Sequence, residues 1–73
     1  MNTYILPFAN ISSDPSVWNM VVRARSISEA KDTIMREITE DWDLDVPTDW
    51  GDFKDILFKE NVIVGDIQDI EEL

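Results

Sequence analysis

Apolar and polar positions alternate over the first third of the chain. Residues 3–9 form a short run of strand-forming side chains. In residues 17–25, one side of the predicted strand carries Trp18, Met20, Val22 and Ala24. A period of two is typical of half-buried strands, and the polar residues between the two runs are typical of a turn. We therefore expect an antiparallel hairpin, with Pro7 confining the first strand to a sheet edge or a strand end because it lacks an amide hydrogen.

A capping motif and a helical period follow this hairpin. Ser26 precedes Glu29 by three positions, the spacing at which a serine hydroxyl and a glutamate carboxylate satisfy the first amides of a helix. The apolar side chains that recur at helical spacing after it are Ile27, Ala30, Ile34 and Ile38. Because they share one helical face, we expect a helix from about residue 27 to about residue 40.

The period returns to two in the next segment. Acidic and apolar side chains alternate there in the order Asp41, Trp42, Asp43, Leu44, Asp45 and Val46. An extended backbone would place the three carboxylates about 6.6 Å apart on one side, and Pro47 would end the pairing. The pattern predicts an acidic edge strand or an extended loop.

A second, shorter helical pattern follows. Thr48 is a suitable N-cap, and Trp50, Phe53 and Leu57 recur at helical intervals. Gly51 lowers the helix propensity by about 1 kcal/mol relative to alanine. We expect a short second helix whose first turn also contains acidic side chains, as the helix dipole favours.

The final segment completes an α+β pattern. Residues 62–64 are strongly strand-forming, and Gly65 predicts a bulge or bend within a strand that continues to about residue 71. We expect a single domain over residues 1–73, with a three-stranded antiparallel sheet (β-β-α-α-β), one long helix packed on one face and a second short helix. A core of this size is marginal, so homodimerisation through an uncovered sheet face or edge is an alternative source of stability.

Composition limits the chemistry that the chain can perform. Its 73 residues include no Cys and no His, which excludes disulfides, thiolate ligands, a Cys nucleophile and the commonest general base. Only two glycines are present, too few for a phosphate-binding loop. No apolar run approaches the roughly 18 residues of a membrane span, and the N-terminal segment lacks the basic region of a signal peptide. We expect a cytoplasmic protein that is not an enzyme and uses no cofactor.

Negative charge is concentrated in the C-terminal half. The 16 Asp and Glu residues outnumber the 6 Lys and Arg residues, which gives a net charge of −10. Residues 1–36 contain four basic and three acidic side chains, whereas residues 37–73 contain two basic and 13 acidic ones. Such asymmetry favours a partner of opposite charge and disfavours direct nucleic-acid binding. Improved solubility is the alternative explanation.

A calcium site is a weaker candidate. The carboxylates that overlap the calcium-loop pattern are Asp41, Asp43, Asp45 and Asp52. The overlap fails at Val46, which stands where such a loop requires glycine for a sharp turn. We therefore expect no metal site.

The density of carboxylates itself predicts a function. Carboxylates held at intervals of several ångströms resemble a row of backbone phosphates, so they would occupy the Arg- and Lys-lined groove of a nucleic-acid-binding protein or complex. The expected partner-binding carboxylates are Asp41, Asp43, Asp45, Asp49, Asp52, Asp55, Asp66, Asp69, Glu71 and Glu72. Trp42 and Trp50 flank this segment and are expected either as interface anchors or as core side chains. The hypothesis is an inhibitor that competes for a basic surface.

Residues 21–31, with the sequence Val-Val-Arg-Ala-Arg-Ser-Ile-Ser-Glu-Ala-Lys, resemble the strand–cap–helix unit of small phage and plasmid proteins, some anti-CRISPR proteins among them. By size and charge, the remainder is similar to anti-restriction and anti-CRISPR proteins of the DNA-mimic type. The resemblance implies a mobile-element inhibitor, and it carries over no residue role. The rival hypothesis is a non-enzymatic interaction or accessory module, monomeric or homodimeric, whose acidity serves solubility.

Overall fold

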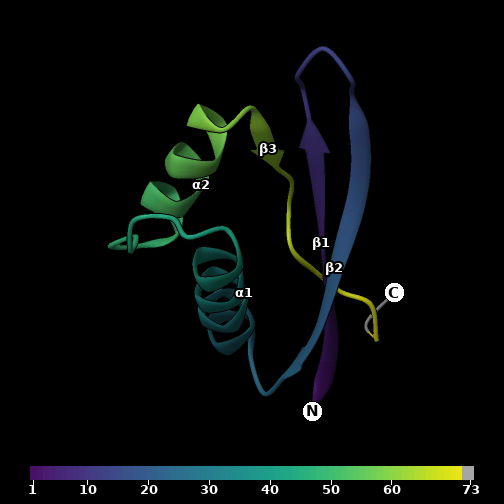
Figure 1. The fold of residues 1–73 in the computed structure, drawn as a ribbon. Coiled ribbons are helices and arrows are strands. Elements are labelled where there is room, and N and C mark those ends of the chain that lie inside the picture. Colours follow the sequence, from purple (N-terminus) through teal and green to yellow (C-terminus); the bar gives the residue numbers. More distant parts are fainter. Residues whose placement is uncertain (72–73) are drawn as a thin grey trace.

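Both helices lie on the same side of an antiparallel sheet (Figure 1). The computed structural model describes residues 1–71. Its elements in chain order are β1 (Asn2–Asn10), β2 (Ser16–Ala24), α1 (Ile27–Asp41), α2 (Trp50–Lys59), β3 (Val62–Val64) and β4 (Gln68–Asp69). β1 is central between β2 and β3, and β4 also pairs with β1. The α+β class, the antiparallel sheet and the long and short helices are confirmed, and the last predicted strand is divided into β3 and β4.

The β1–β2 hairpin is the longest part of the sheet and confirms the alternation seen in the sequence. Nine antiparallel residue pairs join the two strands without interruption. The side of β1 that faces the helices buries Tyr4, Leu6 and Phe8, and the same side of β2 buries Val22 and Ala24. The opposite sheet face has neither helix over it.

Pro7 lies in the central strand, so the prediction of an edge position or a strand end was wrong. The Pro7 carbonyl oxygen accepts a hydrogen bond from the Gly65 N–H, with an N···O distance of 2.8 Å. Because the amide and carbonyl groups of one strand residue point to the same side, the missing Pro7 N–H also faces away from β2. The position of the missing N–H faces residues 65–67, where β1 is not paired with β3 or β4. The β1–β2 hairpin therefore loses no hydrogen bond.

The predicted bend at Gly65 is confirmed. β3 and β4 pair with β1 in registers that differ by one residue, which places an extra residue between them. A Cβ atom at Gly65 would lie 2.6 Å from Cγ of Pro7. Glycine therefore allows the two backbones to approach each other at this point.

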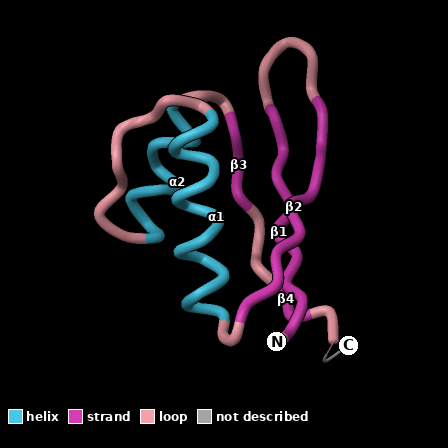
Figure 2. Tube along the Cα trace, turned by 60° about the horizontal axis from the view of Figure 1, so that its bottom comes forward, coloured by secondary structure: helices cyan, strands magenta, loops and turns pink. Residues whose placement is uncertain are grey.

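The two helices close the core over different strands. α1 packs against β2 and α2 against β3, and Figure 2 shows the helices beside each other at one side of the strands. The helical side chains that are buried are Ala30, Ile34, Ile38, Phe53 and Leu57. Ser26 Oγ accepts a hydrogen bond from the Glu29 N–H at 3.1 Å, which confirms Ser26 as the cap. The reciprocal hydrogen bond from the Ser26 N–H to the Glu29 carboxylate is not formed among residues 1–71. No helix within residues 1–71 combines the length and the apolar character needed to cross a bilayer.

Of the two conformations expected for the acidic segment, the edge strand does not form, and residues 44–47 lie in a loop. Asp41 is the last residue of α1, and Trp42 is its C-cap. Asp43 has a φ of 53°, and the Leu44 N–H donates to the Thr39 carbonyl oxygen at 3.0 Å. This combination closes a helix with a left-handed residue, and it turns Leu44 onto the core. The alternating pattern was misleading because the helix continues to Asp41 and its C-terminal hydrogen bonds set the backbone conformation of the next three residues.

α2 begins with a cap that differs from the predicted one. Asp49 is the N-cap in place of Thr48, and its Oδ1 accepts a hydrogen bond from the Asp52 N–H at 2.8 Å. Asp52 Oδ2 in turn accepts from the Thr48 N–H at 2.9 Å. A carboxylate at this position satisfies an unpaired helix amide and also interacts favourably with the helix dipole, which explains the shift by one residue.

Candidate acidic binding surface

The end of α1 and the connection to α2 form a strongly acidic part of the structure. Between Arg36 and Lys54 the chain has seven carboxylates and no basic side chain. The first five of these carboxylates are all exposed. We call this group the acidic end, and its members are Glu37, Glu40, Asp41, Asp43 and Asp45.

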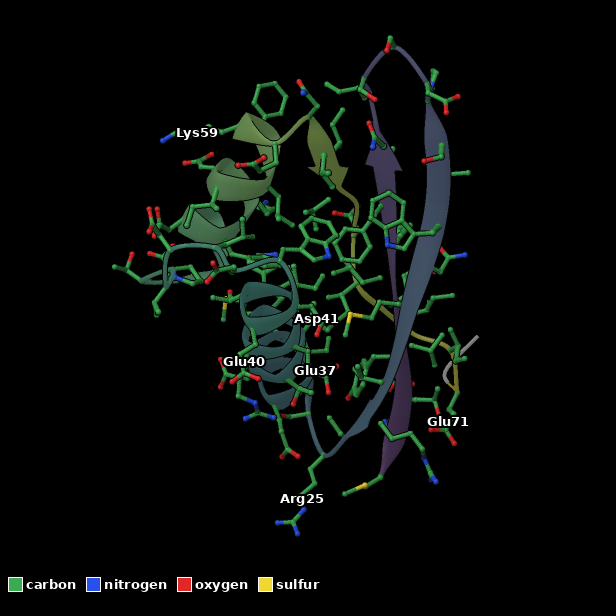
Figure 3. The ribbon with its side chains drawn as sticks, in the orientation of Figure 1. Arg25, Glu37, Glu40, Asp41, Lys59 and Glu71 are labelled. Carbon is green, nitrogen blue, oxygen red and sulfur yellow. The ribbon has the colours of Figure 1, made fainter. Side chains whose placement is uncertain are left out.

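The acidic end covers more than one side of α1. Figure 3 shows Glu37 and Asp41 along the same side of the helix and Glu40 on another side. The four-residue spacing of Glu37 and Asp41 accounts for their common side. Asp43 and Asp45 follow beyond the helix. The carboxylates therefore surround the end of a helix instead of forming a straight row.

The charge of the acidic end opposes the stability of α1. The last turn of the helix contains no basic side chain, although its free carbonyl groups favour Lys or Arg there. Glu37 and Asp41 also repel each other at a spacing of four residues. α2 has the favourable arrangement, with Asp52 in its first turn and Lys59 in its last. Helix stability therefore does not explain the acidic end.

Basic side chains do not neutralise this surface. Within residues 1–71, no Lys or Arg forms an ion pair with a carboxylate. Lys31 lies over the ring of Trp50 instead, 5.3 Å from its centroid. Figure 3 shows Arg25 and Lys59 toward opposite ends of the molecule. The negative potential of the acidic end is therefore open to a partner.

Three further carboxylates predicted to bind a partner lie on or beside α2. Asp49 and Asp52 make the capping hydrogen bonds described above, so part of their acceptor capacity is used by the fold. Asp55 is exposed on the helix. Asp55 extends the charged surface, whereas the first two primarily hold the helix start.

The C-terminal carboxylates form a separate group. Asp69 accepts hydrogen bonds from Asn2 Nδ2 and from the Glu71 N–H, and the Glu71 carboxylate accepts one from the Thr3 N–H. Figure 3 shows Glu71 across the strands from the three labelled carboxylates of α1. Asp66 is exposed beside the bend between β3 and β4. The predicted residue Glu72 lies outside the described residues.

The two predicted anchor tryptophans differ in their surroundings. Trp42 is 38% exposed and contacts Trp18, with ring centroids 6.2 Å apart. Trp50 is partly buried, packs against the core and contacts the ring of Phe53 at 5.2 Å. Trp42 therefore adjoins the acidic end as an accessible aromatic side chain, and Trp50 is chiefly a packing residue.

The sequence-based set of candidates omitted Glu37 and Glu40. Both lie in the predicted helix, which is correct, but the helix was expected to end before Asp41, so their continuity with Asp41 was not recognised. The signal that could have identified them is the absence of any Lys or Arg where the helix ends.

The carboxylates of the calcium-loop pattern are divided between two helices. Asp41 ends α1 and Asp52 lies in the first turn of α2. Among residues 1–71, no group of three acidic side chains is arranged to hold a metal ion.

Comparison with known proteins gives no match to a protein-family model, to a curated protein or to a solved structure. The function is therefore argued from the surface itself.

Proposed function

We propose that this protein is a non-enzymatic inhibitor that binds the basic surface of a nucleic-acid-binding protein or complex through the acidic end of α1. It acts in the cytoplasm, as anti-CRISPR and anti-restriction proteins of the DNA-mimic type do, and its carboxylates take the place of phosphates. The acidic end binds by releasing counterions from the Arg- and Lys-lined groove of its partner, as DNA does.

The observation that carries this proposal is the placement of five exposed, unpaired carboxylates in and just beyond the last turn of α1, where those within the helix disfavour it. Charged residues that serve only solubility are not expected to cluster at the negative end of a helix, because any exposed position would improve solubility equally. A locally unfavourable arrangement is expected where function requires it.

A gel-shift competition titration tests the proposal. The probe is labelled duplex DNA bound to each of a panel of basic proteins, which includes CRISPR effector complexes and restriction endonucleases. We expect the protein to displace DNA from at least one panel member, with an affinity that falls as salt rises. The double variant Asp43→Asn/Asp45→Asn should compete less well, with a salt slope lower by about 2.

A matched double variant controls for net charge. Asp14→Asn/Asp66→Asn removes the same charge outside the acidic end and should compete nearly as well as the wild type. Equal weakening by both double variants would show that only the total charge matters. No displacement from any panel member, even at low salt, would contradict the proposal as a whole.

The uncovered sheet face favours a second candidate, association with a second copy of the chain. Cross-strand pairing places Val17, Ala9 and Ile63 in one row on this face, with Ile5 and Val21 in another. Val17 is 82% exposed and Val21 is 57% exposed. β1, β2 and β3 contain no carboxylate, so the self-repulsion of an acidic protein is weakest here.

Sedimentation equilibrium over a range of protein concentrations tests this second candidate. A concentration-dependent dimer that is abolished by Val17→Lys/Val21→Lys would support it. A monomer at every concentration would exclude it and would leave the acidic surface unaffected.

A further inference from the structure

A hollow of about 430 Å³ adjoins the acidic end, and neither the sequence patterns nor the proposed function assigns it a role. The residues that line it include two tryptophans and two acidic residues, which are Trp18, Trp42, Asp43 and Glu60. No Lys or Arg lines it. We call it the tryptophan hollow.

The hollow is built by the ends of both helices. Trp42 and Asp43 follow the last residue of α1, and Glu60 is the C-cap of α2. The next residue, Asn61, has a φ of 65°, and its carbonyl oxygen accepts a hydrogen bond from the Ile11 N–H at 2.8 Å. Backbone hydrogen bonds thus fix both helix ends, which holds the backbone of Asp43 and Glu60 in place beside the hollow.

The aromatic walls are held by the core. Trp18 stacks on Phe8 with ring centroids 5.3 Å apart and an interplanar angle of 11°. Trp42 is tilted by 51° against Trp18, so the two rings form an angled wall. An indole face attracts a cation through its quadrupole, and nearby carboxylates strengthen that attraction.

We infer that the tryptophan hollow binds the guanidinium group of an arginine side chain of the partner. This inference rests on the proposed function, because it names the anchor by which a basic partner is held at the acidic end. A guanidinium is planar, stacks on aromatic rings and donates to carboxylates in a fork, whereas a lysine ammonium is a compact and strongly hydrated charge. The DNA-binding grooves of the proposed partners offer arginine readily.

Two apolar residues among those that line the hollow favour an anchor over a purely electrostatic contact. These are Leu44 and Val62, and Val62 is buried. The methylene groups of an arginine stem pack on such a surface while the charged end reaches the carboxylates. Pockets that take one large side chain and exclude water typically carry much of the affinity of an interface.

Nuclear magnetic resonance of the three tryptophan indole N–H groups tests this inference with a defined probe. The probe is the capped peptide Ac-Gly-Arg-Gly-NH₂, compared with the same peptide containing uncharged citrulline. We expect saturable shifts of the Trp18 and Trp42 signals with the arginine peptide only. Trp50 lies beside Lys31 and does not line the hollow, so it serves as an internal control.

Variants in which two carboxylates are replaced by amides distinguish binding at the hollow from binding to the acidic surface in general. Asp43→Asn/Glu60→Gln should weaken binding of the arginine peptide at least fivefold, whereas Asp45→Asn/Asp55→Asn should change it less than twofold. Retention of the wild-type pattern of the other backbone amide signals checks that each variant is folded.

Two results would overturn the inference. One is the absence of saturable shifts at low salt, and the other is equal weakening by both double variants. Neither result decides the DNA-competition experiment, because a diffuse acidic surface can displace DNA without an arginine anchor. Conversely, arginine-specific shifts together with no DNA displacement would retain the hollow as a guanidinium site and reject the inhibitor role.

Discussion

Gly65 shows how one residue determines the course of the C-terminal segment past the central strand. Its N–H donates to the Pro7 carbonyl oxygen, and its missing side chain leaves room for the Pro7 ring. Gly51 has a different setting, because a Cβ atom there would meet only Asp49 Oδ1 at 3.4 Å. The close approach to Pro7 therefore requires glycine at position 65, whereas no such contact requires it at position 51.

Alanine substitutions at the two glycines should therefore have opposite effects. Gly65→Ala should lower the free energy of unfolding by about 1–3 kcal/mol, because Cβ overlaps the proline ring. Gly51→Ala should raise it by up to about 1 kcal/mol through helix propensity. Urea denaturation measures both changes, and a stabilised Gly65→Ala variant would contradict the close approach described here.

Among the elements, α2 begins with a network of hydrogen bonds among residues 48–52. Asp49 accepts from the Asp52 amide, and Asp52 accepts from the Thr48 amide and, at 3.3 Å, from its hydroxyl. This network explains why the segment after Pro47 starts a helix at once.

Removal of the observed cap should destabilise the protein more than removal of the predicted one. Asp49→Ala should lower the free energy of unfolding by about 1 kcal/mol, because an amide of the first turn loses its acceptor. Thr48→Ala keeps the backbone hydrogen bond to Asp52 and should change stability by less than about 0.5 kcal/mol. Thermal unfolding compares the two, and the reverse order would assign the cap to Thr48.

The C-terminal end of α1 should respond to charge in a way that separates stability from binding. Asp41→Lys places a cation at the negative end of the helix and four residues after Glu37, which should raise the free energy of unfolding by about 1 kcal/mol. Asp41→Asn should give a smaller gain. Both variants should compete less well for a basic partner, and Asp41→Lys should be the weaker competitor. A destabilised Asp41→Lys variant would show that the carboxylate supports the fold.

The whole molecule has two unlike faces. α1 and its connection to α2 carry the acidic end, while the uncovered side of the sheet presents apolar side chains of β1 and β2, which contain no carboxylate. Because no ion pair within residues 1–71 offsets the acidic groups, repulsion among them acts against the folded state.

Screening this repulsion should stabilise the protein. Raising NaCl from about 0.02 M to about 0.5 M shortens the Debye length from roughly 20 Å to about 4 Å, so the melting temperature should rise by several degrees. The variant Asp41→Lys/Asp45→Lys carries less negative charge and should show a smaller rise. An unchanged or lower melting temperature in the wild type would indicate that the carboxylates do not repel one another appreciably.

Local patterns determined much of this architecture. The alternation in residues 17–25, the Ser26 cap and the helical period after it all depend on neighbours within four positions, so they could be recognised along the chain. The bend at Gly65 was recognisable for the same reason, because an isolated glycine in a strand weakens pairing wherever it occurs.

Only tertiary contacts decided the remaining features. Whether Pro7 lies centrally depends on a break in a strand almost 60 residues away. Whether the acidic segment is strand or helix end depends on Leu44 reaching the core. The tryptophan hollow joins Trp18 to Trp42 and Glu60 from three separate elements. Such outcomes arise from competition between distant packing partners, and this competition leaves no period or motif in the sequence.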